Sequence, residues 1–146
     1  MSRFALVLPA VFLLAGALPA QQAASTTKPS PYSAIPVEAT KQANPVKSTP
    51  ESLAKGKKWW GIDCSMCHNA NGDGKGEMAH DMKLTIADFS DPNTLKDRTD
   101  GELFYVIKNG YQDMPPEGPR VKTEENWDLV NYVRSLAKKT DADKKP

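Results

Sequence analysis

The feature that most constrains this chain is the segment Cys64-Ser65-Met66-Cys67-His68, which holds the only two cysteines among 146 residues. Two thiols at this spacing can reach the two vinyl groups of one porphyrin, and each can form a thioether with it. The histidine that follows the second cysteine is then held beside the iron and supplies one imidazole ligand. The segment therefore predicts one covalently attached haem c, bound through Cys64 and Cys67, with His68 as an iron ligand.

Other uses of two cysteines fit the sequence less well. A disulfide across C-x-x-C would close a very short loop and would constrain little of the unfolded chain. A zinc site would need further cysteine or histidine ligands from outside the segment, and His80 is the only such residue. A redox-active dithiol of the thioredoxin kind would require a βαβ pattern, which the sequence does not show. Haem attachment is therefore the preferred interpretation.

The first twenty residues have the pattern of a secretory signal peptide. An apolar run from Phe4 to Leu18 follows Arg3, and it is shorter than the ~20 residues that a membrane-spanning helix needs. Small residues near its end offer sites for cleavage. We therefore expect export to the periplasm, with membrane contact only through partners or through a signal that stays uncleaved as an anchor.

The remaining sequence divides into a linker, a folded domain and a tail. Residues 21–50 contain five prolines, many Ser, Thr and Ala residues and no apolar periodicity, so they are predicted to form a disordered linker. Residues 51–140 are predicted to form the folded domain, and residues 141–146 a polar tail. A domain of about 90 residues is only marginally stable alone. We therefore expect the porphyrin to complete its core and the haem-free form to fold poorly.

The domain is predicted to be all-α. A first helix over about 51–63 is indicated by Thr49 as N-cap, Pro50 at the first helical position and an apolar stripe. This helix leads the chain into the cysteine segment. The stretch that follows has no strand pattern and is expected to be loop, with one short helical turn near 77–83.

Two further helices are indicated downstream. Thr99 and Glu102 form a capping-box pattern at the start of a helix over about 100–109, and a glycine follows its last residue. A third helix is expected over about 124–138, with Thr123 as N-cap and a broad apolar face. The expected fold class is thus a small helical domain built around the porphyrin.

A second iron ligand has to come from a methionine or from the remaining histidine. Met66 lies inside the attachment segment and cannot reach the other face of the porphyrin, which leaves Met78, Met82, Met114 and His80. Met114 is best placed, because it lies in an irregular segment after a helix and is followed by two prolines that restrict the backbone. Spacing alone leaves the choice among these residues open.

With these features the chain resembles the class I monohaem cytochromes c of bacteria. The similarity covers about residues 51–137. In that family a glycine and an aromatic residue on the first helix cross an aromatic residue on the last, and Gly56, Trp60 and either Tyr132 or Trp127 occupy matching places. The resemblance implies an all-α, cytochrome c-like domain wrapped around one covalently attached haem.

The resemblance also implies which residue is the second iron ligand. The family's methionine ligand lies in a segment that begins with Asn-Gly and ends with Met-Pro. Asn109-Gly110 and Met114-Pro115 match that pattern closely. His68/Met114 ligation is the implied arrangement.

One feature departs from the family pattern. Many relatives carry a proline shortly after the cysteine segment, and its carbonyl accepts the Nδ1 proton of the ligating histidine. Here no proline occurs between His68 and Pro92. A ligating histidine needs such a partner to orient its ring, so another backbone carbonyl within residues 77–92 is expected to take this place.

These features predict an electron-transfer protein and not an enzyme. An iron with histidine and methionine ligands has no open position and exchanges one electron with little rearrangement. We expect a monomer that carries electrons in a respiratory chain, between a membrane electron donor and a terminal acceptor. Such partners dock briefly through small interfaces. The 19 basic and 18 acidic residues show no large excess of one sign, which argues against nucleic acid as a partner.

Two alternatives use the same motif. If the sixth iron ligand is labile, the protein could be a haem enzyme or a gas sensor that handles peroxide or nitric oxide, although the sequence shows no distal acid–base pair. The chain could instead be a dedicated cytochrome subunit of a larger oxidoreductase.

Overall fold

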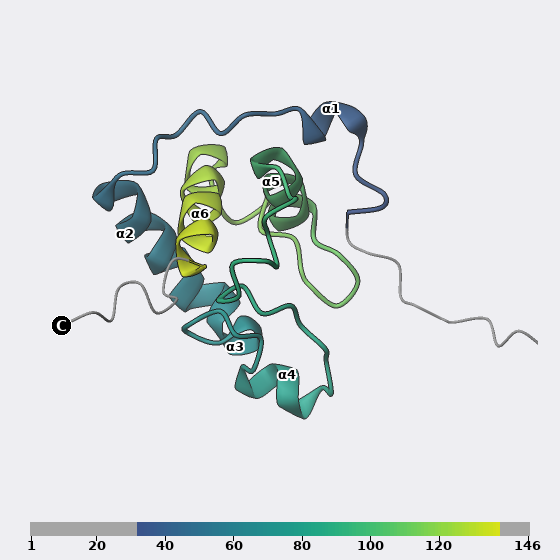
Figure 1. Cartoon of the computed structure of the whole chain (residues 1–146). Coiled ribbons are helices and arrows are strands. Elements are labelled where there is room, and N and C mark those ends of the chain that lie inside the picture. The colour runs from purple at the N-terminus through teal and green to yellow at the C-terminus, as the bar shows by residue number, and fades with distance from the viewer. Residues whose placement is uncertain (1–31, 138–146) are drawn as a thin grey trace, which may run out of the picture.

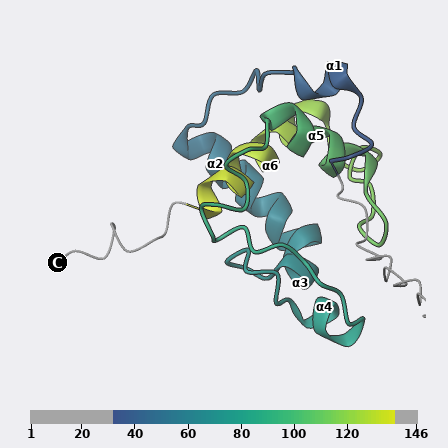
Figure 2. The ribbon, with the colours of Figure 1, turned by 45° about the vertical axis from the view of Figure 1, so that its right-hand side comes forward.

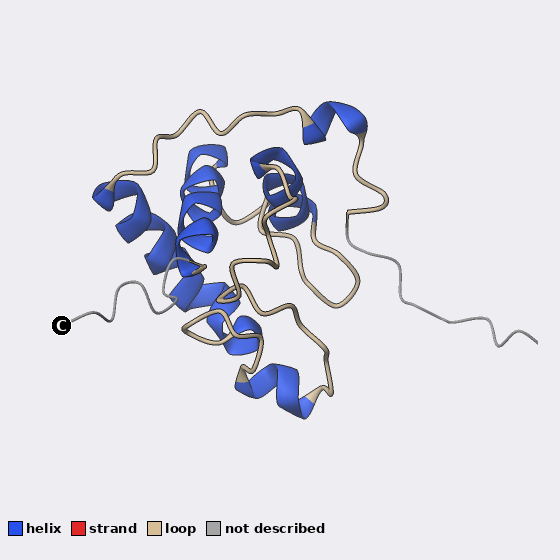
Figure 3. Ribbon diagram, viewed as in Figure 1, coloured by secondary structure: helices blue, strands red, loops and turns tan. Residues whose placement is uncertain are grey.

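The computed structural model describes residues 32–137, and their regular elements are all helices (Figure 1, Figure 3). In chain order they are α1 (Val37–Thr40), α2 (Pro50–Trp59), the π-helical turn η1 (Trp60–Cys64), α3 (Ser65–His68), α4 (Glu77–Asp81), α5 (Asp100–Asn109) and α6 (Thr123–Leu136). Over residues 32–137 there is no strand, only an isolated bridge between Tyr111 and Met114. The prediction of an all-α fold is confirmed.

Helices α2 and α6 cross at the centre of the fold (Figure 2). Their axes come close because Gly56 lies at the crossing: a Cβ atom there would lie 2.7 Å from Tyr132 Cβ and would collide with the Asp128 carbonyl oxygen. Next to the crossing, the rings of Trp60 and Tyr132 lie 5.8 Å apart. Tyr132, and not Trp127, is therefore the aromatic residue that meets the first helix.

The first long helix begins as the sequence predicts. Thr49 Oγ1 accepts a hydrogen bond from the Ser52 N–H (3.2 Å), and Pro50 occupies the first helical position. The helical backbone does not end at residue 63 as predicted. It continues through η1 and α3 to His68. The π-helical turn ends at the first cysteine, Cys64, and leads directly into the rest of the cysteine segment.

Helix α5 confirms its predicted bounds and cap. Thr99 Oγ1 accepts from the Glu102 N–H (3.1 Å), and Glu102 Oε2 accepts from the Thr99 N–H (2.7 Å). The helix packs on α6, where the Phe104 and Trp127 rings stack with centroids 4.0 Å apart. This stack belongs to the core shared by α5 and α6.

Helix α6 begins one residue earlier than predicted. Its first residue is Thr123 and its N-cap is Lys122, whose N–H donates to Glu125 Oε2 (3.2 Å). The prediction of Thr123 as N-cap is therefore wrong by one position. Lys122 is the N-cap, because the Glu125 carboxylate accepts the hydrogen bond from its N–H. The buried side of α6 also carries polar residues that the apolar pattern did not indicate, namely Asn126, Asp128 and Asn131.

The expected disordered linker over 21–50 has to be corrected from residue 32 onward. Residues 32–46, which we call the N-terminal strap, run across one end of α5 and α6 before α2 begins (Figure 1). Asn44 Nδ2 donates to Asn131 Oδ1 (2.9 Å) and to the Trp127 carbonyl oxygen (3.2 Å). Asn131 Nδ2 donates in turn to the Val46 carbonyl oxygen (3.1 Å). These long-range hydrogen bonds order a segment whose composition alone favours disorder.

The predicted signal peptide (residues 1–20) and the predicted polar tail (141–146) lie outside the described residues. Within residues 32–137, no helix combines the length and the apolar character that crossing a membrane requires.

Candidate functional site

A short helical segment with tethered ends places both cysteines and His68. The turn η1 passes directly into α3, which ends where Asn69 takes a left-handed φ of 66°. Trp60 Nε1 donates to the Asn69 carbonyl oxygen (3.1 Å), and the Gly76 N–H donates to the Cys67 carbonyl oxygen (3.1 Å). The end of the segment is thereby tied back to the first residue of η1, and its second cysteine is tied to the following loop.

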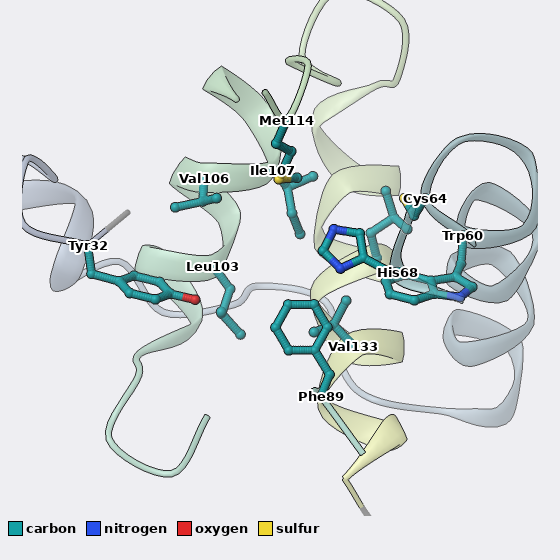
Figure 4. Close-up of a pocket in the computed structure, with 11 residues that line it drawn as sticks. Tyr32, Trp60, Cys64, His68, Phe89, Leu103, Val106, Ile107, Met114 and Val133 are labelled. Atoms are coloured by element: carbon teal, nitrogen blue, oxygen red, sulfur yellow. The ribbon is translucent and has the colours of Figure 1, made fainter. Parts of the chain in front are cut away.

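This segment lines a cavity of about 480 Å³. A space of that size is typical of small-molecule and cofactor sites. Cys64, Cys67, His68 and Met114 all line it, so the structure brings the four sequence-predicted site residues together. In the adjoining inner pocket, His68 and Met114 reach the same space from different segments (Figure 4). The walls of that pocket are largely apolar and include Trp60, Phe89, Leu103, Val106, Ile107, Leu129 and Val133.

Aromatic neighbours hold the His68 ring. Phe89 stacks on it with centroids 5.2 Å apart and an interplanar angle of 17°, and Trp60 lies at 5.5 Å with an angle of 45°. Burial lowers the pKa of His68 to about 4. The imidazole is therefore neutral at ordinary pH, which is the state in which a ring nitrogen can bind a metal.

The expected carbonyl partner of His68 is not found in the described part of the chain. His68 Nδ1 is buried and has no hydrogen-bond partner among these residues. The physical reason lies in the segment that passes the ring. The carbonyl oxygens of Ile86 and Ala87 point toward Gly74, and a Cβ atom on Gly74 would lie 2.6 Å and 3.1 Å from them. The same segment places the Phe89 side chain, and not a carbonyl oxygen, against the His68 ring.

Met114 is carried by a tight turn after α5. The N–H of Tyr111 donates to the Met114 carbonyl oxygen (3.0 Å), and the N–H of Met114 donates to the Tyr111 carbonyl oxygen (2.9 Å). Gly110 opens the turn with a φ of 74°, and a Cβ there would lie 2.6 Å from the Met114 carbonyl oxygen. Only glycine combines this φ with so close an approach. The Asn-Gly pair before the methionine therefore has a direct structural role.

The other histidine and the other methionines of the described chain lie away from the cavity. The His80 side chain is 90% exposed, and Met66, Met78 and Met82 are also exposed. None of the four lines the cavity. Of the residues that the sequence left open, Met114 alone is placed beside His68.

The state of the thiols agrees with a role as covalent anchors. Both are free, and burial raises the pKa of the Cys64 thiol to about 12, with further contributions from the negative charges of Glu117 and Asp63. A thiol with so high a pKa is protonated at neutral pH and is therefore not itself a reactive thiolate. Two free thiols, a neutral imidazole, a thioether and apolar walls fit an iron porphyrin.

The residues of the cavity wall that were not anticipated from the sequence include Tyr32, Arg98 and Glu117. Tyr32 belongs to the strap, and the Arg98 guanidinium lies 4.4 Å from the centroid of its ring. No local pattern links two positions so far apart in the chain. Glu117 did leave a signal, since it is a charged residue directly after two prolines in the segment that carries Met114.

Comparison with known families agrees with this geometry. The model of the family described as Cytochrome c matches residues 53–137, which is more than half of the chain. The chain belongs to the cytochrome c family. It therefore contains a haem-binding domain of an electron-transfer family, and the two cysteines have the spacing for covalently bound haem c.

A solved structure shares this cytochrome c fold. A chain of the Kuenenia stuttgartiensis reducing HAO-like protein complex Kustc0457/Kustc0458 is 25% identical in sequence, with a TM-score of 0.55. The similarity covers 63% of the present chain and 46% of that chain, so the match spans less than half of its length. Among curated proteins no significant match was found.

Proposed function

We propose that this cytochrome c is an exported one-electron carrier with a single haem c, held by His68 and Met114 as iron ligands. The observation that carries the proposal is the shared cavity. It is lined by both thiols of the attachment segment, by a neutral imidazole and by one methionine thioether, and all other histidines and methionines of the described chain lie outside it.

Each of these residues has a distinct role. Cys64 and Cys67 anchor the porphyrin through thioethers, and the φ of 66° at Asn69 ends the segment so that His68 stays at the cavity wall. Phe89 and Trp60 fix the plane of the imidazole, while the turn around Gly110 fixes the Met114 backbone. Haem bound in this way supplies reversible one-electron chemistry, and a methionine ligand raises its potential. The largely apolar walls of the inner pocket limit the access of water to that part of the site.

Export and brief docking belong to the same proposal. The pattern of residues 1–20 is that of a secretory signal, and a periplasmic location would allow exchange of electrons between a membrane donor and a terminal acceptor. Redox encounters of this kind use small interfaces that release quickly.

A second candidate is supported by the structural comparison. The similar chain belongs to a complex described as a reducing HAO-like protein complex. A dedicated cytochrome subunit of a larger oxidoreductase is therefore the alternative to a free shuttle. Gel filtration of the exported protein at high salt separates the two, since a shuttle elutes as a small free protein and a dedicated subunit elutes with its partner.

The ligation is tested by absorption spectra of the exported, haem-loaded protein, oxidised and reduced, beside Met114→Ala and the control Met82→Ala. Met82 is 53% exposed and lies outside the cavity. We expect a weak far-red sulfur-to-iron band in the wild type and in Met82→Ala, and its loss together with a lower reduction potential in Met114→Ala. If the band is absent from the wild type, Met114 is not the ligand, and a high-spin spectrum would favour an enzyme or a gas sensor.

A further inference from the structure

Glu117 is a buried carboxylate in the wall of the haem cavity, and the electron-carrier role does not use it. Its side chain is only 5% exposed, and it lines the cavity together with Cys64 and Met114. The N–H of Glu117 donates to the Ile107 carbonyl oxygen (2.9 Å), which fixes its backbone against α5. The residue is therefore held in place.

The two oxygens of this carboxylate have different surroundings. Glu117 Oε1 accepts from Arg120 Nη2 at 2.6 Å, and the same guanidinium donates from Nη1 to Asp63 Oδ1 at 2.9 Å. Glu117 Oε2 is buried and has no hydrogen-bond partner among the described residues. One oxygen of the carboxylate is thus stabilised as an anion by Arg120, and the other is buried without a compensating hydrogen bond from the described residues.

Three segments pack against Glu117, and two of them bring charged side chains toward it. Its own segment supplies Arg120, which is half exposed, and η1 supplies the Asp63 carboxylate and the Cys64 thiol. From α5 the contact is made by backbone, and the charged side chain there, Lys108, lies over the Phe104 ring with Nζ 5.8 Å from the centroid. Two further charged residues, Arg98 and Asp113, line the rest of the cavity.

A carboxylate in this setting responds to a change of charge inside the cavity. Burial raises the pKa of Glu117, and the hydrogen bond and charge of Arg120 act in the opposite direction. A positive charge gained in the cavity favours the ionised carboxylate, and its loss favours the protonated acid. By linkage, the protonation of Glu117 must then change the electron affinity of the site by the same factor.

We propose that Glu117 is a proton-binding site coupled to the oxidation state of the haem, so that electron transfer by this protein is linked to proton transfer. On oxidation one electron passes to the acceptor, and Glu117 releases its proton to solvent along the Arg120 side of the site. On reduction one electron enters, and Glu117 takes the proton back. This inference rests on the proposed function, because it needs a reversible one-electron centre in the cavity.

The test measures the reduction potential of the exported holoprotein as a function of pH, together with the infrared difference spectrum between the reduced and oxidised states. The variants are Glu117→Gln, which keeps the shape and the Arg120 contact, and the control Glu51→Gln. Glu51 is 80% exposed on α2, so its replacement makes the same change in net charge without touching the cavity. Haem carboxylates also titrate, but they are common to all samples.

We expect the wild-type potential to fall with rising pH through the titration of Glu117, and a carboxylic-acid band to appear in the reduced state. In Glu117→Gln that step and that band are lost. At pH values above the wild-type step, the ratio of oxidised to reduced Glu117→Gln at a fixed ambient potential is about tenfold lower than that of the wild type. This is the effect expected of unit charges roughly 10 Å apart in protein. Glu51→Gln behaves as the wild type. Arg120→Gln removes the cation, so its pH step moves to higher pH.

The proposal is overturned if Glu117→Gln keeps the wild-type pH profile and band, or if its potential shifts while the band persists. It is also overturned if the step in Arg120→Gln does not move, an outcome that stays informative should Glu117→Gln fail to fold. A reversible couple and far-red band with no Glu117 effect would leave the electron-carrier proposal standing. Absence of a reversible one-electron couple would overturn that proposal instead.

Discussion

Replacing Gly56 by alanine should separate the two helices at the centre of the fold. The new Cβ would lie 2.7 Å from Tyr132 Cβ and 2.9 Å from the Asp128 carbonyl carbon. Real Cβ atoms do not approach other heavy atoms so closely. None of these neighbours is the end of a flexible side chain, so the clash cannot be relieved by a change of rotamer. The helices themselves have to move.

Two opposing contributions decide the size of the effect. Alanine in a helix interior is favoured over glycine by about 1 kcal/mol. Overpacking of a close contact costs about 1–3 kcal/mol and sometimes more. Separation of α2 from α6 also lengthens the buried hydrogen bond from Ser52 Oγ to Asp128 Oδ1 (2.5 Å), which adds ~1 kcal/mol. We therefore expect a net loss of about 1–3 kcal/mol in the free energy of unfolding, or about 4–24 °C in Tm for a domain of this size.

The assay is denaturant and thermal unfolding of the haem-loaded protein, followed by far-UV circular dichroism. Gly61→Ala is the matched control, because a Cβ at Gly61 would meet nothing within 4 Å. This control should be as stable as the wild type or up to about 1 kcal/mol more stable. A Gly56→Ala protein with wild-type stability would refute the reasoning, because it would show that the crossing has room for a methyl group.

Two further predictions concern other parts of the molecule. Asn44→Ala removes the side chain that ties the strap to α6, so it should lower the free energy of unfolding by about 1–3 kcal/mol and speed proteolysis near the strap; unchanged cleavage would contradict the strap's role. Hydrogen bonds, first of all from Asn69 (2.9 Å), lower the pKa of Asp73 below its usual 3.8. The contribution of the Asp73 carboxylate to the free energy of unfolding is present above pH 3.8 and is lost as the pH falls through the lowered pKa. In Asp73→Asn the free energy of unfolding, measured by urea titration, should therefore fall less steeply with decreasing pH than in the wild type. An equally steep fall would show that Asp73 does not cause this pH dependence.

Features that depend on a few neighbouring residues could be predicted from the sequence. The capping box of Thr99 and Glu102 and the N-cap at Thr49 occur where the sequence places them, because caps are local interactions. Gly56 at the helix crossing could be named only from the family resemblance, and the structure supplies its reason. The four residues expected at the haem also line one cavity, although the sequence contains no distances.

Features that depend on distant contacts could not be predicted. The strap has the composition of a linker, and its order comes from hydrogen bonds between Asn44 and α6 that no local pattern reveals. The widening of the helix at η1 also left no sequence signal. The expected carbonyl partner of His68 failed for a related reason: the sequence shows that a proline is missing, but not which way the replacing segment turns its carbonyls.

The strap also changes where the boundary of the functional unit should be drawn. The family match begins at residue 53, and a chain cut there would retain every residue expected to bind haem. Yet Tyr32 lines the cavity, and its ring lies under the Arg98 guanidinium. At Gly101 a side chain would collide with the Ala39 carbonyl oxygen, so α5 is shaped to receive the strap. Removing the strap would open one wall of an apolar cavity to water and strip a hydrogen-bond partner from the buried amide of Asn131. The environment that sets the potential of the haem therefore depends on a segment that lies outside the family pattern.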